Sequence, residues 1–588
     1  MRLIPPVIPL AIIALSAASS AQTPTPLPGL PAAILPPVQP WSGASERLIV
    51  AANDPWITPA ERAGFATTPR YAETRAWLER LAAASPLIRI ETFGRTAQGR
   101  DMLMVRASKG GEGKPVVLVQ AGIHSGEIDG KDTGLMLLRD IAFGGKDSLL
   151  DSVDLVFVPI YNIDGHEASS RWNFPALRGP SDKGYVATAR GINLNRDYAK
   201  ADAPETRAMI ALLRRLDPIL YVDCHVSDGF DMQYDITFTY AGWGRYAYHR
   251  ATADWLTGRF GPTVTAALER AGHVPTLYPS PIDTRDPAKG IRQAPEGPRY
   301  STGYGDFIGV PTVLVENHML KPYRQRVLGT YVLLEAALKL AATDRARRPA
   351  TMLARWKPAA TPIGWIERFK GIGFETYRSP ASGRMEQRWT GKPITVRMPI
   401  IGQDPVETVS LPTAWWVPAE QTEALDRLRL HGIRLDPITA PRTLTLDRVH
   451  LRDAVVQRAQ DGRLPLKASF EHVSVTETLP AGTVRVPSDQ PLGLLAAALL
   501  EPEAPDSLLA WGFFPEMLSS PPGAEDFVRA PLAEALLASD ETVRTAFAAK
   551  LADDPAFARD PEARLDWLID RLPNRKTAHL TYPILRER

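Results

Sequence analysis

The sequence predicts an α/β fold in which a mainly parallel, mixed sheet is flanked by helices, followed by an α+β or β-rich accessory region. Along residues 71–345, short apolar segments such as Val116–Val119 alternate with helical patterns. Such uncharged, β-branched segments are typical of parallel strands buried on both faces. Beyond Arg345, strand-like segments are separated by proline and glycine, which predicts a second region at 346–588 with a different architecture.

Length and composition limit the possible functions. The chain has 588 residues, too many for one hydrophobic core, so we expect two or three domains. Apolar residues make up 44% and charged residues 23%, which is ordinary for a globular protein. The net charge is only +2, without a long basic segment, so we expect no nucleic-acid partner.

The first 21 residues predict a secretory signal. They combine Arg2, an apolar segment to about Ala18 and small residues at Ser19 and Ala21, with cleavage expected after Ala21. This segment is too short to span a bilayer, so we expect no membrane span in the mature chain and a periplasmic or secreted location. Residues 22–70 form a proline-rich lead-in, and the single cysteine, Cys224, excludes an intramolecular disulfide.

Apolar periodicity predicts the elements of residues 71–345 in order. Expected helices are Tyr71–Ala84, a helix from Ile128, one after Asp202, Ala251–Ala271, and about Arg324 to Ala342. Expected strands are Ile88–Phe93, Met102–Arg106, Val116–Val119, Val153–Ile160, Ile219–Val226 and Thr312–Glu316. Asp202 and Glu205 have the spacing of a capping box, with Pro204 in the first turn.

Histidine and glutamate side chains follow the strand Val116–Val119. The chain turns at Gly122, and His124 and Glu127 lie three positions apart in that turn. Ligands of α/β sheets bind at the carboxyl ends of strands, and imidazole and carboxylate are natural Zn²⁺ ligands. Taken alone, an H-x-x-E spacing is also what a turn histidine with a solvated glutamate would give.

Two further strands end in groups that bind metals or transfer protons. Ile219–Val226 carries His225, and strand alternation puts Cys224 on the opposite face, in the core. Glu316 closes the apolar segment Val313–Val315. Two His and one Glu leave a fourth position of a tetrahedral zinc open, as in catalytic sites, and a carboxylate beside the metal can take a proton from water. Asn195 and Arg196 suit a carboxylate ligand, although alone they indicate only a solvated loop.

In this order, the segments resemble the zinc metallocarboxypeptidases of the M14 (carboxypeptidase A-like) family, over about Tyr71 to Ala342. The resemblance implies a carboxypeptidase-like fold and one Zn²⁺ per chain. It also implies roles for single residues: His124, Glu127 and His225 as zinc ligands, Asn195 and Arg196 as the grip on the substrate's C-terminal carboxylate, and Glu316 as general base. Asn162-x-Asp164-Gly165 matches the family's loop after the next strand.

The sequence departs from the family pattern at several positions. Asn193 stands where an aspartate often supports the first zinc histidine, and Gly126 where some relatives have a substrate-contacting arginine. The arginine that polarises the scissile carbonyl corresponds to Arg171 or Arg178, and we favour Arg171. The tyrosine that closes over substrate corresponds to Tyr300 or Tyr304, of which we select Tyr300.

Residues 346–588 offer no chemistry that we can assign. Strands are expected at Ile394–Met398, Leu444–Leu446, Lys467–Thr476 and Thr483–Val486, a helix at Ala419–Leu430 and helices in Ala524–Leu572. Trp415-Trp416 and Trp511–Phe514 suit an exposed binding face for sugars or peptide, but we expect core or interface aromatics.

The sequence therefore predicts an exported zinc carboxypeptidase that hydrolyses the last bond of peptides with a free C-terminal carboxylate. One alternative is a related amidohydrolase, either a muropeptide peptidase or a deacylase of N-acyl amino acids. Another is an inactive zinc-binding protein that binds peptides or cell wall. Glu316 argues against the inactive version, because nothing structural requires a carboxylate there.

Overall fold

The computed structural model describes residues 34–111, 113–227, 229–340, 352–356, 361–403, 405–519, 525–572 and 579–588. The predicted signal, residues 22–33 of the lead-in and the predicted linker at 345–349 lie outside the described residues. Among the described helices, none is long and apolar enough to cross a bilayer.

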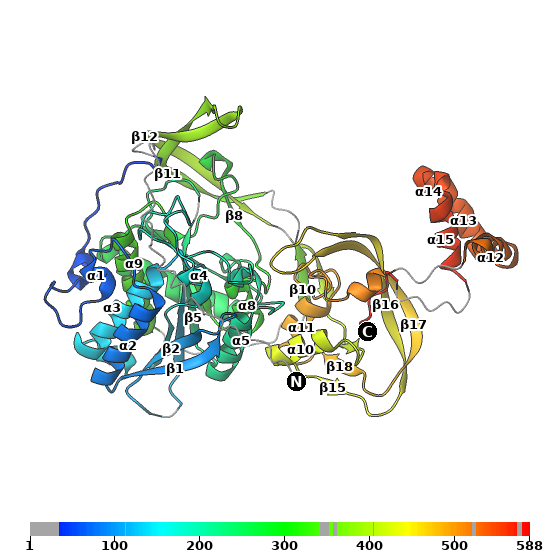
Figure 1. Ribbon diagram of the computed structural model, residues 1–588, viewed down its shortest axis with the longest axis horizontal. Coiled ribbons are helices and arrows are strands. Elements are labelled where there is room, and N and C mark those ends of the chain that lie inside the picture. Colours follow the sequence, from blue (N-terminus) through cyan, green and yellow to red (C-terminus); the bar gives the residue numbers. More distant parts are fainter. Residues whose placement is uncertain are drawn as a thin grey trace, which may run out of the picture.

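An eight-stranded mixed sheet organises the first domain (Figure 1). Its strands are β1 (Ile88–Arg95), β2 (Asp101–Ala107), β3 (Val116–Ala121), β4 (Asp154–Val158), β5 (Leu220–Ser227), β6 (Ile236–Tyr240), β7 (Pro275–Leu277) and β9 (Thr312–His318). Their order is β1-β2-β4-β3-β5-β9-β6-β7. The central strands β4, β3, β5 and β9 are parallel, and antiparallel pairs lie toward the edges. The predicted mainly parallel, mixed sheet is confirmed.

Helices cover both faces of this sheet. The first-domain helices are α1 (Pro59–Arg62), α2 (Tyr71–Ala84), α3 (Asp129–Phe143), α4 (Ile163–Glu167), α5 (Pro204–Leu216), α6 (Arg250–Trp255), α7 (Gly261–Arg270), α8 (Ser301–Phe307) and α9 (Tyr323–Leu340). Val117 and Val119 of β3 pack with α2, α3, α7 and α9, whereas Leu118 faces α5 and α8. Every residue of β3 is buried, as its apolar sequence predicts.

The second region is rich in β-structure and contains a long hairpin (Figure 1). Strands β11 (Thr361–Arg378) and β12 (Met385–Gly402) form this hairpin, and β12 pairs with β8 (Ile291–Gln293) of the first domain. A short pair joins β10 (Met352–Trp356) and β13 (Pro405–Ser410). A six-stranded sheet follows, made of β14 (Ala414–Val417), β15 (Asp436–Pro437), β16 (Arg442–Val456), β17 (Leu466–Leu479), β18 (Val484–Pro487) and β19 (Leu585–Glu587). Helices of this region are α10 (Thr422–His431), α11 (Gly493–Leu500), α12 (Asp526–Ser539), α13 (Glu541–Asp553), α14 (Pro555–Arg559) and α15 (Pro561–Ile569).

The hydrophobic core of the second region is continuous with one core of the first domain. Trp415, Trp511 and Phe514 are at most 2% exposed and belong to the same cluster as Leu118 of β3 and Met209 of α5. Trp416 is also buried, in a smaller cluster. These aromatics are therefore core residues, as expected, and not an exposed binding face.

Two local expectations need correction. The predicted capping box at the start of α5 is wrong: the residue before the helix is Ala203, which offers no side-chain cap. Asp202 instead binds Arg427 and Arg463 of the second region, and Glu205 accepts a hydrogen bond from the Ala97 N–H. The predicted helix Ala251–Ala271 forms, but a π-helical turn, Leu256–Phe260, separates α6 from α7.

Candidate active site

His124 and Glu127 lie in the turn that follows β3. Gly122 adopts φ +68°, a left-handed conformation that glycine tolerates and that lets the chain turn sharply. The Glu127 N–H donates to the His124 carbonyl at 2.9 Å, which closes the turn. His124 Nδ1 consequently lies 3.0 Å from Glu127 Oε1.

His225 reaches the same carboxylate from the neighbouring strand. The parallel register of β3 and β5 pairs Ala121 with Cys224, which places His225 beside the turn. Its Nδ1 lies 3.1 Å from Glu127 Oε2, and the Val226 N–H donates to the same oxygen at 3.0 Å. One ligand atom from each of His124, Glu127 and His225 lies within 4.8 Å of the others, close enough to hold one metal ion. Cys224 is buried on the opposite face, as expected.

Each imidazole has an acceptor for its outer nitrogen. His124 Nε2 lies 3.0 Å from Asn193 Oδ1, and His225 Nε2 lies 2.9 Å from Asp223 Oδ2. A proton on each Nε2 leaves both Nδ1 lone pairs directed at Glu127, which is the tautomer that a metal requires. The donor set and its supporting acceptors therefore fit Zn²⁺.

The sequence interpretation missed Asp223, although the signal was present. Asp223 precedes His225 by two residues on one strand, so both side chains lie on the same face. Oδ1 of Asp223 accepts a hydrogen bond from Gln120 Nε2 at 2.8 Å. Gln120 Oε1 in turn accepts from the hydroxyls of Tyr221 at 2.9 Å and Tyr198 at 3.2 Å. This buried network fixes the Asp223 carboxylate.

Charges around the ligand group favour a cation. Burial opposes ionisation of Glu127, but the imidazoles of His124 and His225 hold its pKa well below the usual range. Burial also disfavours the imidazolium of His225, yet Asp223, Glu127 and Glu316 together raise the pKa of His225 well above its ordinary value. Without a metal, the carboxylates thus attract a proton to His225, and a divalent cation would replace that proton.

Glu316 lies beside this group on β9. The parallel register pairs Glu316 with His225. Its side chain is partly buried, and its charge is one of those that raise the pKa of His225. The predicted general base and the predicted metal ligands are therefore neighbours at the carboxyl ends of adjacent strands.

Asn195 and Arg196 lie in a 3₁₀ turn, Leu194–Arg196, that is tied to the metal-binding group. Asn193 Oδ1 accepts from His124 Nε2 and also from the Asn195 N–H at 2.9 Å. Asn195 Oδ1 accepts from the Ser301 N–H at 2.9 Å, and the Arg196 guanidinium lies 4.7 Å from the Tyr300 ring centre. A single amide therefore connects a candidate zinc ligand to the candidate carboxylate grip.

The two candidate tyrosines have different environments. Tyr300 is partly buried and faces Arg196. Tyr304 is 1% exposed, and its hydroxyl lies 3.0 Å from Nδ1 of His431 in the second region. Tyr304 is thus a core residue, whereas Tyr300 lies against Arg196.

A family model described as zinc carboxypeptidase, Peptidase_M14, matches residues 74–241. Residues 74–241 are therefore similar to an M14 zinc carboxypeptidase domain. The matched range includes His124, Glu127, Asn195, Arg196 and His225 and ends before Glu316.

Curated relatives of the M14 domain are carboxypeptidases. Carboxypeptidase B of Astacus astacus is 28% identical over 132 residues, which is 22% of this chain and 44% of that protein. The match thus spans less than half of that relative. Carboxypeptidase 2 of Trichophyton equinum is 22% identical over 422 residues, covering 68% of this chain and 74% of the relative.

Solved structures similar to the M14 domain include two bacterial metallo-carboxypeptidases. The enzyme from Burkholderia cenocepacia is 17% identical. The alignment covers 47% of this chain and 70% of that enzyme, with a TM-score of 0.35. The Pseudomonas aeruginosa enzyme, in complex with (2-guanidinoethylmercapto)succinic acid, is also 17% identical. The alignment covers 47% of this chain and 71% of that enzyme, with a TM-score of 0.36.

The M14 domain has no room for a side chain before Glu127. A Cβ added to Gly126 would lie 2.3 Å from Cδ2 of Phe174, so an arginine at this position would displace that ring. Arg171, three residues before Phe174, is exposed with its guanidinium 5.2 Å from the Trp172 ring centre. Arg178 is engaged elsewhere, because its guanidinium donates to the Pro36 carbonyl. Of these two arginines, Arg171 is exposed and Arg178 is partly buried.

The Asn162 loop of the M14 domain supports the metal-binding turn. The Ser125 hydroxyl donates to the Asn162 carbonyl at 2.5 Å, and Asn162 Oδ1 caps α4 by accepting from the Gly165 N–H at 3.0 Å. Asp164 is bound by Thr96 and Arg100. These residues hold Ser125, and with it the turn from His124 to Glu127.

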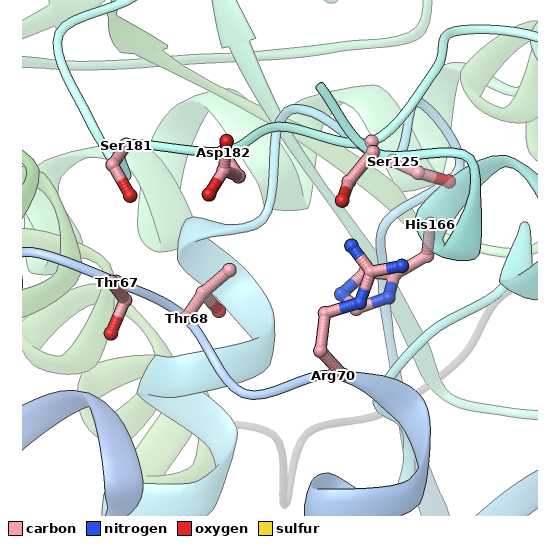
Figure 2. Close-up of a pocket in the computed structure, with 9 residues that line it drawn as sticks. Thr67, Thr68, Arg70, Ser125, His166, Ser181 and Asp182 are labelled. Atoms are coloured by element: carbon pink, nitrogen blue, oxygen red, sulfur yellow. The ribbon is translucent and has the colours of Figure 1, made fainter. Parts of the chain in front are cut away.

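A pocket of about 220 Å³, lined mainly by polar residues, includes Ser125 of this turn (Figure 2). Its lining residues are Thr67, Thr68, Arg70, Ser125, His166, Ser169, Ser181, Asp182 and Gly184. Burial lowers the pKa of His166 to about 4, so this imidazole is neutral at pH 7. The pocket lining includes Ser125 of the metal-binding turn but none of the three candidate ligands.

Proposed function

We propose that this chain is a zinc carboxypeptidase, which hydrolyses the C-terminal peptide bond of peptides. The observation that carries the proposal is the double role of Asn193. Its Oδ1 binds both His124 Nε2 and the backbone N–H of Asn195, the residue before Arg196. Metal-binding and carboxylate-binding residues are thereby held in one unit, with Glu316 beside His225.

The zinc ion would be held by His124, Glu127 and His225, one ion per chain. When bound, zinc supplies Lewis acidity, which makes water a nucleophile near neutral pH and stabilises negative charge on a carbonyl oxygen. Asn193 and Asp223 keep the two imidazoles in the required tautomer.

Glu316 acts as general base and then as general acid. It accepts a proton as the water oxygen attacks the carbonyl carbon of the last peptide bond. When the C–N bond breaks, Glu316 gives this proton to the leaving amine nitrogen. Arg171 is our candidate for stabilising the oxyanion, since its guanidinium is exposed on the loop whose Phe174 packs against Gly126.

Asn195 and Arg196 select the bond that is cleaved. The guanidinium of Arg196 can bind the terminal carboxylate of a peptide through two parallel hydrogen bonds. Tyr300, which packs on Arg196, restricts the orientation of that guanidinium. The signal predicted at residues 1–21 would bring the enzyme to the periplasm or outside the cell.

A digest of a mixed peptide library tests this proposal. Wild type should contain about one zinc per chain by elemental analysis and remove C-terminal residues one after another, as seen by mass spectrometry. Glu316→Gln should keep the zinc but lose about 10²–10⁴-fold in kcat, because an amide cannot accept the proton. His225→Ala should lose the metal.

Glu269→Gln, which changes an exposed carboxylate of α7, is the matched control and should behave as wild type. Activity of Glu316→Gln within about tenfold of wild type would show that another base acts. Cleavage only at internal bonds would reject the carboxypeptidase assignment.

A further inference from the structure

The segment from Glu296 to Thr302 lies against Asn195 and Arg196, the proposed carboxylate grip. It connects β8 to α8 and is held by both residues of the carboxylate grip. Asn195 Oδ1 accepts from the Ser301 N–H at 2.9 Å, and the Arg196 guanidinium stacks on Tyr300. If Arg196 binds the terminal carboxylate, this segment lies next to the last residue of a bound peptide.

Glu296 brings a carboxylate to this place. The Thr302 hydroxyl donates to Glu296 Oε2 at 2.6 Å, and the backbone N–H of Gly242, in the turn after β6, also donates to Glu296. Both donors are neutral. Burial, with a smaller contribution from the charge of Asp306, raises the pKa of Glu296 to about 7, although the hydrogen bonds from Thr302 and Gly242 and the charge of Arg196 oppose this shift.

The neighbouring charged side chains are committed to other partners. Arg299 binds Asp506 and stacks on Trp511 of the second region. Asp306 accepts the backbone N–H groups of Tyr248 at 2.7 Å and His249 at 3.1 Å. Arg196 would be occupied by the terminal carboxylate of the substrate. Glu296 is thus the acidic group of this segment that can still receive a cation.

We propose that Glu296 binds the side chain of the substrate's last residue and makes the enzyme prefer peptides that end in lysine or arginine. This inference rests on the proposed carboxypeptidase function. Arg196 then recognises the negative end of the last residue and Glu296 the positive end. A partly buried carboxylate is poorly solvated, so an ammonium or guanidinium that replaces the lost hydration is favoured over a neutral side chain of similar length.

Three peptides that differ only in the last residue test the proposal. They end in lysine, in norleucine, which has the same carbon chain without the ammonium, and in glutamate. Wild type should cleave the lysine peptide at least about 30-fold better in kcat/KM than the norleucine peptide, and the glutamate peptide least well. Glu296→Gln should abolish the lysine preference and leave norleucine cleavage within about threefold. Glu269→Gln should keep the wild-type preference.

The outcomes separate this inference from the proposed function. Equal cleavage of lysine and norleucine peptides by wild type, or an unchanged preference in Glu296→Gln, would overturn the role of Glu296 while leaving the carboxypeptidase intact. If zinc-loaded wild type releases no C-terminal residue from any peptide, the proposed function fails.

Calorimetry with the Glu316→Gln variant tests the inference independently of turnover. The lysine peptide should bind at least about 30-fold more tightly than the norleucine peptide, and the added change Glu296→Gln should equalise the two affinities. Equal affinities without that added change would reject the inference.

Discussion

The two candidate zinc histidines are supported by different acceptors. His124 Nε2 faces the amide of Asn193, whereas His225 Nε2 faces the carboxylate of Asp223. Around Asn193 Oδ1, both described donors are N–H groups, from His124 and Asn195. Asp223 likewise receives one donor on each oxygen, from His225 and Gln120. An aspartate has two acceptor oxygens and would suit both positions. An asparagine has one, so it suits only position 193, where a single oxygen accepts both hydrogen bonds.

Exchanging these acceptors should therefore have opposite effects on zinc affinity. Asn193→Asp should bind zinc as tightly as wild type or more tightly. Asp223→Asn should lose about 10- to 100-fold in affinity, because its NH₂ group must face a donor on Gln120 or His225. Competition with a chelator measures both constants. The double variant restores the net charge, so a charge effect alone would return its affinity to that of wild type. Undiminished affinity in Asp223→Asn would contradict this account.

The pH dependence of substrate preference follows from Glu296. Burial raises its pKa to about 7, above the ordinary value of 4.5, so the carboxyl is neutral below that pH and charged above it. The ratio of kcat/KM for lysine over norleucine peptides should rise between pH 5.5 and 8 and then level off. Effects on the metal-binding group cancel in this ratio. Glu296→Gln should give a flat profile, and a flat wild-type profile would contradict the assignment.

At the scale of single residues, the sequence predicted groups that share a strand end, but not those that meet through distant loops. His124, Glu127, His225 and Glu316 follow from the parallel sheet, because neighbouring strands end at one edge. Glu296 does not, since its position depends on contacts of its segment with Asn195 and Arg196, about a hundred positions away.

At the scale of elements, the second region packs directly on the segment Asn193–Asp202. Asp461 accepts the Asn193 N–H at 3.1 Å, and Arg427 donates to the Lys200 carbonyl at 2.6 Å. Asp202 binds Arg463 at 2.6 Å and Arg427 at 3.0 Å. These contacts hold the segment that contains Asn195 and Arg196, the proposed carboxylate grip.

Removing the Asp202 charge should weaken this packing. Burial opposes its ionisation, but Arg463, Lys200 and Arg427 lower the pKa of Asp202 to about 2, below the ordinary 3.8. A depressed carboxyl pKa gives stability that is present above about pH 4 and is lost as the pH falls through 2. In urea titrations, Asp202→Asn should lower the free energy of unfolding by about 2 kcal/mol at pH 7 and by less near pH 2.

Asp426→Asn is the matched control, because Asp426 is exposed and pairs with Arg429 on its own helix. It should change the free energy of unfolding by less than about 0.5 kcal/mol. Equal effects of the two substitutions would mean that the Asp202 cluster contributes nothing specific.

Element prediction was most accurate where one periodic pattern dominated. The helix α2 begins and ends at the expected residues, Tyr71 and Ala84. The capping box at Asp202 and Glu205 was wrong because both carboxylates have partners that no local pattern indicates. In the second region, β12 extends well beyond the predicted strand Ile394–Met398. Its second half alternates apolar residues, at Ile394, Val396 and Met398, whereas its first half, from Met385 to Pro393, is mainly polar and lacks the pattern that marks a strand.

At the scale of the whole molecule, the second region is a structural part of the active-site support. It shares a hydrophobic core with the sheet, and its side chains contact the segments of Asn193 and of Arg299. The sequence did not predict this role, because the core residues of the two regions are separated by hundreds of positions. The parallel centre of the sheet was predictable, since β3, β4, β5 and β9 each contain a short apolar segment.

The proposed function depends most on Arg196, which we expect to bind the free C-terminal carboxylate of the substrate beside the metal. The most direct measurement compares kcat/KM for one peptide with a free C-terminus and for the same peptide with a C-terminal amide. In wild type the free acid should be much the better substrate. Arg196→Ala should lose about 30- to several-thousand-fold on the free acid and far less on the amide, with zinc content unchanged. Equal cleavage of acid and amide by wild type would contradict the claim and indicate an endopeptidase or amidase at the same site.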